Sequence, residues 1–223
     1  MTQLQGSTPG DVLARALHLR DEWRYDEVAA LCDAESAEAF FRRHMEACKP
    51  PTIDEVLEEY PDVGLDTAKV FAARFAQFCE DQKRALVRSL RGVSSFDEVV
   101  ALGPRDFLSR WLESMDVRYD LLRRVRAAGR PVPDWLSHGP RGIRYEIMGE
   151  ERVDDSTVRV SYRDTVDTDR ATNYGSERSE LVRRLPNGEW RLVVRALLLH
   201  PGEVAHEVPP EFADLFLDEL PPR

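Results

Sequence analysis

The chain has 223 residues and a formal net charge of −10, with 42% hydrophobic and 32% charged residues. This length and apolar content are sufficient for one domain with a sizeable core. The acidic balance argues against a sequence-independent nucleic-acid binder, which needs a clustered basic surface.

The three cysteines, Cys32, Cys48 and Cys79, fall in helical patterns and form no C-x-x-C motif. An odd number of cysteines argues against a disulfide framework and fits a reducing compartment. No segment approaches the roughly 18 consecutive apolar residues of a membrane span, and the first residues lack the basic and apolar regions of a signal peptide. We therefore expect a soluble, cytoplasmic protein that contacts neither membrane nor nucleic acid.

The first part of the chain is expected to be helical after a disordered N-terminus over 1–10. A helical pattern begins at Pro9, and a bend near Trp23 divides it into two pieces. A third helix is expected over about 34–48, because two prolines follow it and end the pattern.

Two Ser/Thr-x-x-Glu sequences predict further helix starts. One runs from Thr52 to Glu55 and the other from Ser95 to Glu98. The helical pattern then continues to Gly129.

The longest helix is expected over about 66–91. Phe71, Phe75 and Phe78 recur along it at i, i+4 and i+7. This spacing is typical of a helix packed on a sheet, so the sequence predicts that the three rings face the core.

From Ile143 onward the apolar period becomes two, which indicates strands. The expected strands cover about 143–152, 157–166, 177–185 and 190–199. The predicted fold is α+β, with N-terminal helices packed on a curved, cone-like antiparallel sheet. The domain spans 11–199 with a helical insertion at about 50–140, and a proline-rich tail follows over 200–223.

The pair Asn187-Gly188 between two strand patterns is a strong hairpin signal. A two-residue loop at this pair would place Leu185 opposite Trp190. In that register Leu181, Arg183 and Trp190 face the helices, with Trp190 as a core side chain. Val182, Val193 and Glu180 then lie on the outer face, where Glu180 pairs with Arg195.

The first two strands allow a similar prediction. A loop at Asp154-Asp155 would pair Glu146 with Arg163 and Glu150 with Arg159. Two opposite-charge pairs support this register. The outer face of the sheet then combines paired charges with valines, a composition that fits a dimer interface.

The order of elements resembles the nuclear-transport-factor-2-like superfamily, which includes SnoaL-type cyclases and ketosteroid-isomerase-like proteins. The resemblance rests on the opening helices over 11–48 and on the sheet over 143–199, which closes on the hairpin Asn187–Leu192. It implies a cone with an apolar pocket between helices and sheet, where a carboxylate base acts in the isomerases. No catalytic residue of the family falls at a matching position, and residues 50–140 depart from the pattern as an insertion.

The candidate pocket residues are aromatic side chains and two charged groups expected on the helix-facing side of the sheet. They are Trp23, Tyr145, Tyr162, Asp164, Arg183 and Trp190. Aromatic residues with polar tips bury a ring and keep a hydrogen-bonding group for a ligand. An ionised Asp164 would need a partner, and Arg183 is the nearest cation in the predicted register. The alternative is that these two residues form a structural ion pair or lie exposed.

Several chemistries find no support in the sequence. The motifs GxGxxG, GxxxxGK[ST], GxSxG and HExxH are absent. His44 and Cys48 share a helix face, but no second pair accompanies them, so we expect no metal and no cofactor.

The sequence therefore favours a non-catalytic binding or assembly module, because an acid–base constellation is missing. Two alternatives stay open. One is a small isomerase, cyclase or hydratase acting on an apolar ligand, and the other is an acidic inhibitor or immunity-type protein. The expected partner is a small apolar molecule or a protein, with a homodimer through the sheet as one arrangement.

Overall fold

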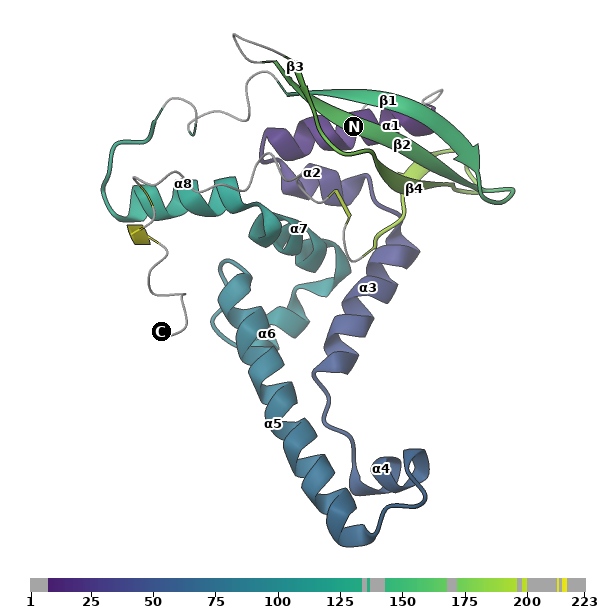
Figure 1. Ribbon diagram of the computed structural model, residues 1–223. Coiled ribbons are helices and arrows are strands. Elements are labelled where there is room, and N and C mark those ends of the chain that lie inside the picture. Colours follow the sequence, from purple (N-terminus) through teal and green to yellow (C-terminus); the bar gives the residue numbers. More distant parts are fainter. Residues whose placement is uncertain are drawn as a thin grey trace.

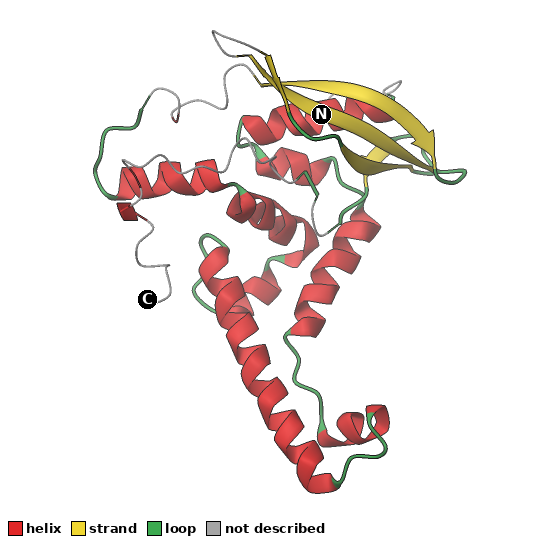
Figure 2. Cartoon of the chain, viewed as in Figure 1, coloured by secondary structure: helices red, strands yellow, loops and turns green. Residues whose placement is uncertain are grey.

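The computed structural model describes residues 8–133, 136, 143–167, 172–195, 198–199, 212 and 214–215. Most of the predicted disordered N-terminus (1–10) and of the predicted tail (200–223) lies outside the described residues. Helices come first and strands second along the chain, so the fold is α+β as predicted (Figure 2).

Eight helices are present within the described residues, close to the predicted positions. They are α1 (Pro9–Asp21), α2 (Tyr25–Ala30), α3 (Ala34–Ala47), α4 (Ile53–Glu59), α5 (Leu65–Ser89), α6 (Phe96–Ala101), α7 (Gly103–Met115) and α8 (Val117–Ala127).

The described strands form one antiparallel sheet in the order β1–β2–β4–β5, with a short β3 paired to β2. They are β1 (Ile143–Arg152), β2 (Thr157–Asp167), β3 (Thr172–Tyr174), β4 (Arg178–Arg184) and β5 (Trp190–Leu192). Helices α1 and α2 lie along one face of this sheet (Figure 1).

Capping explains where the shorter helices begin. Thr52 and Glu55 form the predicted capping box, in which each side chain accepts from the other residue's backbone N–H. Ser95 Oγ likewise accepts from the Glu98 N–H. The Glu98 carboxylate, however, accepts from Ser94 and not from the Ser95 N–H, so the second box is only half formed.

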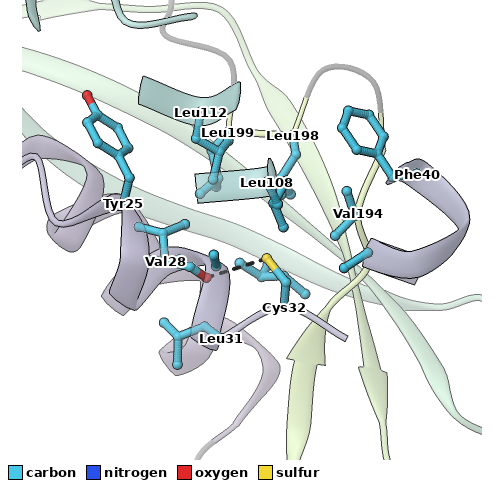
Figure 3. Packing of buried hydrophobic residues seen from close by; sticks show 14 of the residues in the cluster. Tyr25, Val28, Leu31, Cys32, Phe40, Leu108, Leu112, Val194, Leu198 and Leu199 are labelled. Carbon is cyan, nitrogen blue, oxygen red and sulfur yellow. Dashed lines mark hydrogen bonds between the residues drawn. The ribbon is translucent and has the colours of Figure 1, made fainter. Parts of the chain in front are cut away.

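The main core lies between the sheet and helices α1, α2, α3 and α7. Leu108 and Leu112 of α7 pack there with Val28 of α2 (Figure 3). Cys32 Sγ donates a hydrogen bond to the Val28 carbonyl oxygen at 3.4 Å. Helix α7 belongs to the segment predicted as an insertion, so part of that segment completes the core.

The prediction for the phenylalanines of α5 is wrong. Phe75 is 45% exposed, Phe78 is 56% exposed and Phe71 is half-buried. Helices α4 and α5 project away from the sheet as an arm (Figure 1). Within α5 the buried side chains are Ala68, Cys79 and Leu86, which are mostly small.

The predicted register of β1 and β2 is correct from Ile143 to Ile147. Glu146 lies opposite Arg163, and their side chains approach to 2.7 Å. A bulge between Ile147 and Gly149 then shifts the register by one residue. As a result Arg159 pairs with Glu151, at 2.8 Å, and not with Glu150.

The predicted two-residue hairpin loop is also wrong. Arg184, not Leu185, lies opposite Trp190, and three residues, Pro186 to Gly188, form the turn. Gly188 has a φ of 86°, and its N–H donates to the Leu185 carbonyl oxygen. Proline suits the second position of a type I turn, and a glycine in the left-handed region completes the three-residue loop.

This single-residue difference inverts the two faces of β4, because side chains alternate along a strand. Val182 and Glu180 are buried on the helix-facing side, although they were assigned to the outer face. Leu181 and Arg183 are only half-buried. The predicted pair of Glu180 and Arg195 does form, at 3.0 Å.

All three cysteines are free and buried. Among the described residues, no helix combines the length and apolar character needed to cross a membrane. Phe212, from the region predicted as a tail, packs with Leu121, Leu122 and Val125 of α8.

Candidate functional site

A buried arginine lies at the centre of a polar cluster between α1 and the sheet. Arg20 is 6% exposed. Its guanidinium donates to Asp21 Oδ1 at 3.0 Å, to the Leu199 carbonyl oxygen at 2.9 Å and to the Tyr145 hydroxyl at 2.5 Å. Burial disfavours the charge, but Tyr145 and Asp21 outweigh it and raise the pKa of Arg20.

Tyr145 links this arginine to the neighbouring carboxylate. Its hydroxyl accepts from Arg20 and donates to Asp21 Oδ2 at 2.5 Å. Burial raises the pKa of Tyr145, so the hydroxyl keeps its proton and remains a donor at neutral pH.

The cluster continues to the N-terminus of α8. Asp116 caps that helix and accepts a hydrogen bond from the Tyr25 hydroxyl at 2.7 Å. Arg118 Nη2 lies 3.4 Å from Asp116 Oδ2 and 3.7 Å from Asp21 Oδ1. Together with Arg20, these residues give two cations and two anions, so the buried charges balance.

Three buried polar atoms beside this cluster lack a hydrogen-bond partner among the described residues. They are Trp23 Nε1, Arg118 Nε and the Tyr162 hydroxyl oxygen. The Tyr162 ring lies edge-on to Tyr145, with ring centroids 6.5 Å apart, and burial raises the pKa of Tyr162 to about 12. Trp23 lies beside Tyr119 of α8, at 5.6 Å between ring centroids. Each of these atoms is therefore able to form a hydrogen bond with a polar group of a ligand.

The predicted pair of Asp164 and Arg183 does not form. Asp164 is buried and accepts from Arg178 Nη2 at 2.6 Å. Arg183 instead donates to Asp33 at 3.2 Å and to Glu35 at 3.1 Å. Arg183 lies opposite Thr157 at the start of β2, seven residues along the strand from Asp164, so it reaches the N-terminus of α3 and not Asp164.

Trp190 belongs to a separate groove. It is half-buried there and is not the fully buried core side chain that the sequence predicted. The groove has a volume of about 870 Å³, within the usual range for small-molecule sites. The apolar part of its lining comes from α1, the end of α2, the starts of α3 and α7, and the β4–β5 hairpin. It consists of Leu19, Ala29, Ala30, Leu31, Cys32, Ala34, Ala37, Pro104, Leu185 and Trp190.

Charged side chains surround this apolar lining, and some of them already have partners. Glu189 pairs with Arg191 at 2.7 Å, and Arg191 Nη1 also donates to the Ala30 carbonyl oxygen at 2.6 Å. Glu27 pairs with Arg24 at 2.5 Å.

The remaining charges of the groove favour an anion. Among the described residues, Arg15, Arg105 and Glu38 form no ion pair and are exposed. Two of these three groups are cations. The lining as a whole holds three arginines and three glutamates, so its formal charge is zero, and among the described residues the two cations without an ion pair, Arg15 and Arg105, stand against one such anion, Glu38.

The groove holds no strongly activated nucleophile among its described residues. Burial raises the pKa of the Cys32 thiol to about 12. A reactive cysteine needs a lowered pKa, so this thiol is inert at neutral pH. No group of three or more histidine, cysteine or acidic side chains among the described residues could hold a metal ion.

Sequence reasoning brought only part of these sites together. Tyr145, Tyr162 and Asp164 do lie together, since Asp164 is opposite Tyr145 and its partner Arg178 stacks over the Tyr162 ring at 5.0 Å. Trp190 and Arg183 lie elsewhere. Arg20 was missed, although it follows Leu13 and Leu17 at the spacing of the buried stripe of α1. A charged residue at such a position is the signal that could have identified it.

Arg15 and Arg105 were also missed, and no feature of the sequence distinguishes them. They are exposed helical arginines in a chain that contains many. Only the fold brings them to one groove.

No family model, no curated protein and no solved structure matches the chain.

Proposed function

We propose that this protein is a non-catalytic binding module whose Trp190 groove holds an amphiphilic ligand. The ligand has an extended apolar body and a terminal anionic group such as a carboxylate. The observation that carries the proposal is the combination, in one groove of about 870 Å³, of an apolar lining with Arg15 and Arg105. Pockets that recognise small molecules commonly combine an apolar lining with a few charged groups.

Binding is favoured over catalysis because the described residues of the groove include no activated acid, base or nucleophile. Glu27 and Glu189 are held by arginines. Glu38 is exposed, and burial keeps the Cys32 thiol protonated. A general acid or base needs a free group with a tuned pKa near the substrate. Membership of the nuclear-transport-factor-2-like superfamily remains part of this proposal, supported by helices that precede an antiparallel sheet.

Isothermal titration with two ligands of equal length and opposite charge tests the proposal. Decanoate should bind at least tenfold more tightly than decylamine, because the groove has two cations without ion-pair partners among the described residues. The double variant Arg15→Glu/Arg105→Glu should remove this preference. Trp190→Ala should weaken both ligands.

Arg43→Glu is the matched control, since Arg43 is an exposed arginine of α3 outside the groove lining. Equal affinity for the two ligands, no binding of either, or an equal loss in Arg43→Glu would refute the proposal.

A further inference from the structure

The arm formed by α4 and α5 exposes several large apolar side chains to solvent. Leu65 and Val70 are 54% and 50% exposed, in addition to the exposed Phe75 and Phe78. Contiguous apolar patches on soluble proteins usually mark interaction sites. This surface is separate from the Trp190 groove and is not used by the proposed ligand.

The pattern along α5 is that of a helix-pairing seam. Phe71, Phe75, Phe78, Gln82 and Ala85 follow one another at intervals of four, three, four and three residues. This alternation is the heptad spacing that keeps one side of a helix against a partner helix. Gln82 and Ala85 are exposed as well, so the seam continues over about two turns beyond Phe78.

We propose that α5 pairs in an antiparallel manner with α5 of a second copy of this chain, around a two-fold axis at Phe78. In this arrangement Phe78 faces its own symmetry mate. Phe71 faces Ala85 of the second copy, so a large side chain meets a small one. Phe75 faces Gln82 in the same way, and each contact occurs twice because the interface is isologous.

Charge determines the direction of pairing. Arg74 and Asp81 are seven residues apart and lie on the same side of the seam, away from the buried face of α5. Arg74 is exposed and forms no ion pair among the described residues, while Asp81 lies 3.6 Å from Arg84. Antiparallel pairing brings Arg74 of each copy beside Asp81 of the other. Parallel pairing would instead bring Arg74 and Asp81 beside Cys79 and Leu86 of the second copy, which are buried within their own chain, and would form no ion pair.

The outer face of the sheet is a weaker choice for self-association. Its charges are already paired within the chain, Glu146 with Arg163 and Glu151 with Arg159. Of the two valines assigned to that face, Val182 is buried on the helix-facing side and Val193 is half-buried.

Sedimentation of the full chain tests the pairing. A single pair of helices gives an interface near the lower size limit for stable complexes, so we expect a dimer with a roughly micromolar dissociation constant. The mass should rise with concentration from 25.6 kDa toward twice that value. A chain that remains monomeric up to about 100 times that concentration would overturn the proposal.

Two single variants separate the seam from the rest of the helix. Phe78→Glu places two carboxylates at the two-fold axis and should abolish the dimer. Val70→Glu introduces the same charge at an equally exposed apolar position outside the seam, and it should leave the dimer intact. Circular dichroism checks that both variants keep their helices. Equal dissociation by both variants would contradict the seam.

Charge reversal identifies the partner as a second copy. Arg74→Asp and Asp81→Arg should each weaken the homodimer at least tenfold, because both symmetry-related contacts become repulsive. When the two variants are mixed, every contact becomes attractive again, so a heterodimer should form. If the mixture fails to form a dimer, α5 does not pair in this register.

Discussion

The Tyr145 hydroxyl donates to Asp21 Oδ2 at 2.5 Å and thereby ties β1 to the end of α1. The same oxygen accepts from Arg20 at 2.5 Å, so one hydroxyl bridges a buried cation and a buried anion. Removing it would leave both charged groups with an incomplete set of partners.

Tyr145→Phe should therefore destabilise the fold by about 1–3 kcal/mol, the usual cost of leaving a buried polar group without its partner. Urea denaturation measures this loss. Tyr174→Phe removes a hydroxyl from a side chain that is 62% exposed and should change stability by less than about 0.5 kcal/mol. Similar effects of the two substitutions would mean that the hydroxyl bridge contributes little.

Gly175 provides a test of how closely Asp164 is packed. A Cβ atom at Gly175 would overlap Asp164 Oδ1 and lie 2.7 Å from its Cγ. Gly175→Ala should displace the carboxylate from Arg178 and cost about 1–3 kcal/mol. Gly149→Ala is the control, since nothing lies within 4 Å of the added Cβ. Equal melting temperatures for the two variants would contradict this packing.

Local signals in the sequence were sufficient to locate the helices. The exchange of hydrogen bonds between Thr52 and Glu55 involves residues three apart, so the sequence alone determines it. The change of apolar period at Ile143 likewise located the sheet.

Strand register was harder to predict because a difference of one residue reverses every side chain. Asn187-Gly188 favours a two-residue loop, yet Pro186 before it favours a type I turn one residue longer. The bulge beside Gly149 had a comparable effect on the pairing of Arg159. The predicted site failed at the hairpin, since Arg183 and Trp190 depended on its register, whereas the bulge moved no candidate site residue.

The exposure of Phe75 and Phe78 was not predictable from spacing alone. An apolar stripe shows that a helix has a partner surface, but it does not show whether that surface belongs to the same chain. In this structure α5 extends away from the core, so its apolar stripe is exposed.

Gly188 allows the three-residue loop to be tested directly. Its φ of 86° lies in the left-handed region, while the nearest atom to an added Cβ, on Arg184, is 3.9 Å away. Gly188→Ala should cost about 1–2 kcal/mol from backbone strain alone. Gly188→Asn should cost less, because asparagine tolerates this conformation. Equal costs, measured by thermal denaturation, would point to a steric cause.

Glu180 predicts a pH dependence of stability. It is 3% exposed, and its carboxylate accepts from Arg195 at 3.0 Å and from the Leu199 N–H at 2.8 Å. Burial outweighs these bonds and raises the pKa of Glu180 above its ordinary value of 4.5. An acid with a raised folded-state pKa contributes stability that is present below its unfolded pKa and is lost as the pH rises through the folded pKa.

Wild type should therefore lose stability relative to Glu180→Gln as the pH rises from about 4 to about 7, because only the wild type has to ionise a buried carboxyl group. Urea denaturation of both proteins across this range measures the difference, and the other acids cancel from it. Arg195→Gln should steepen the loss relative to a matching Arg195→Gln/Glu180→Gln double variant, since it removes a cation that lowers the pKa of Glu180. A wild type that gains stability over Glu180→Gln as the pH rises would show that the ion pair with Arg195 outweighs burial.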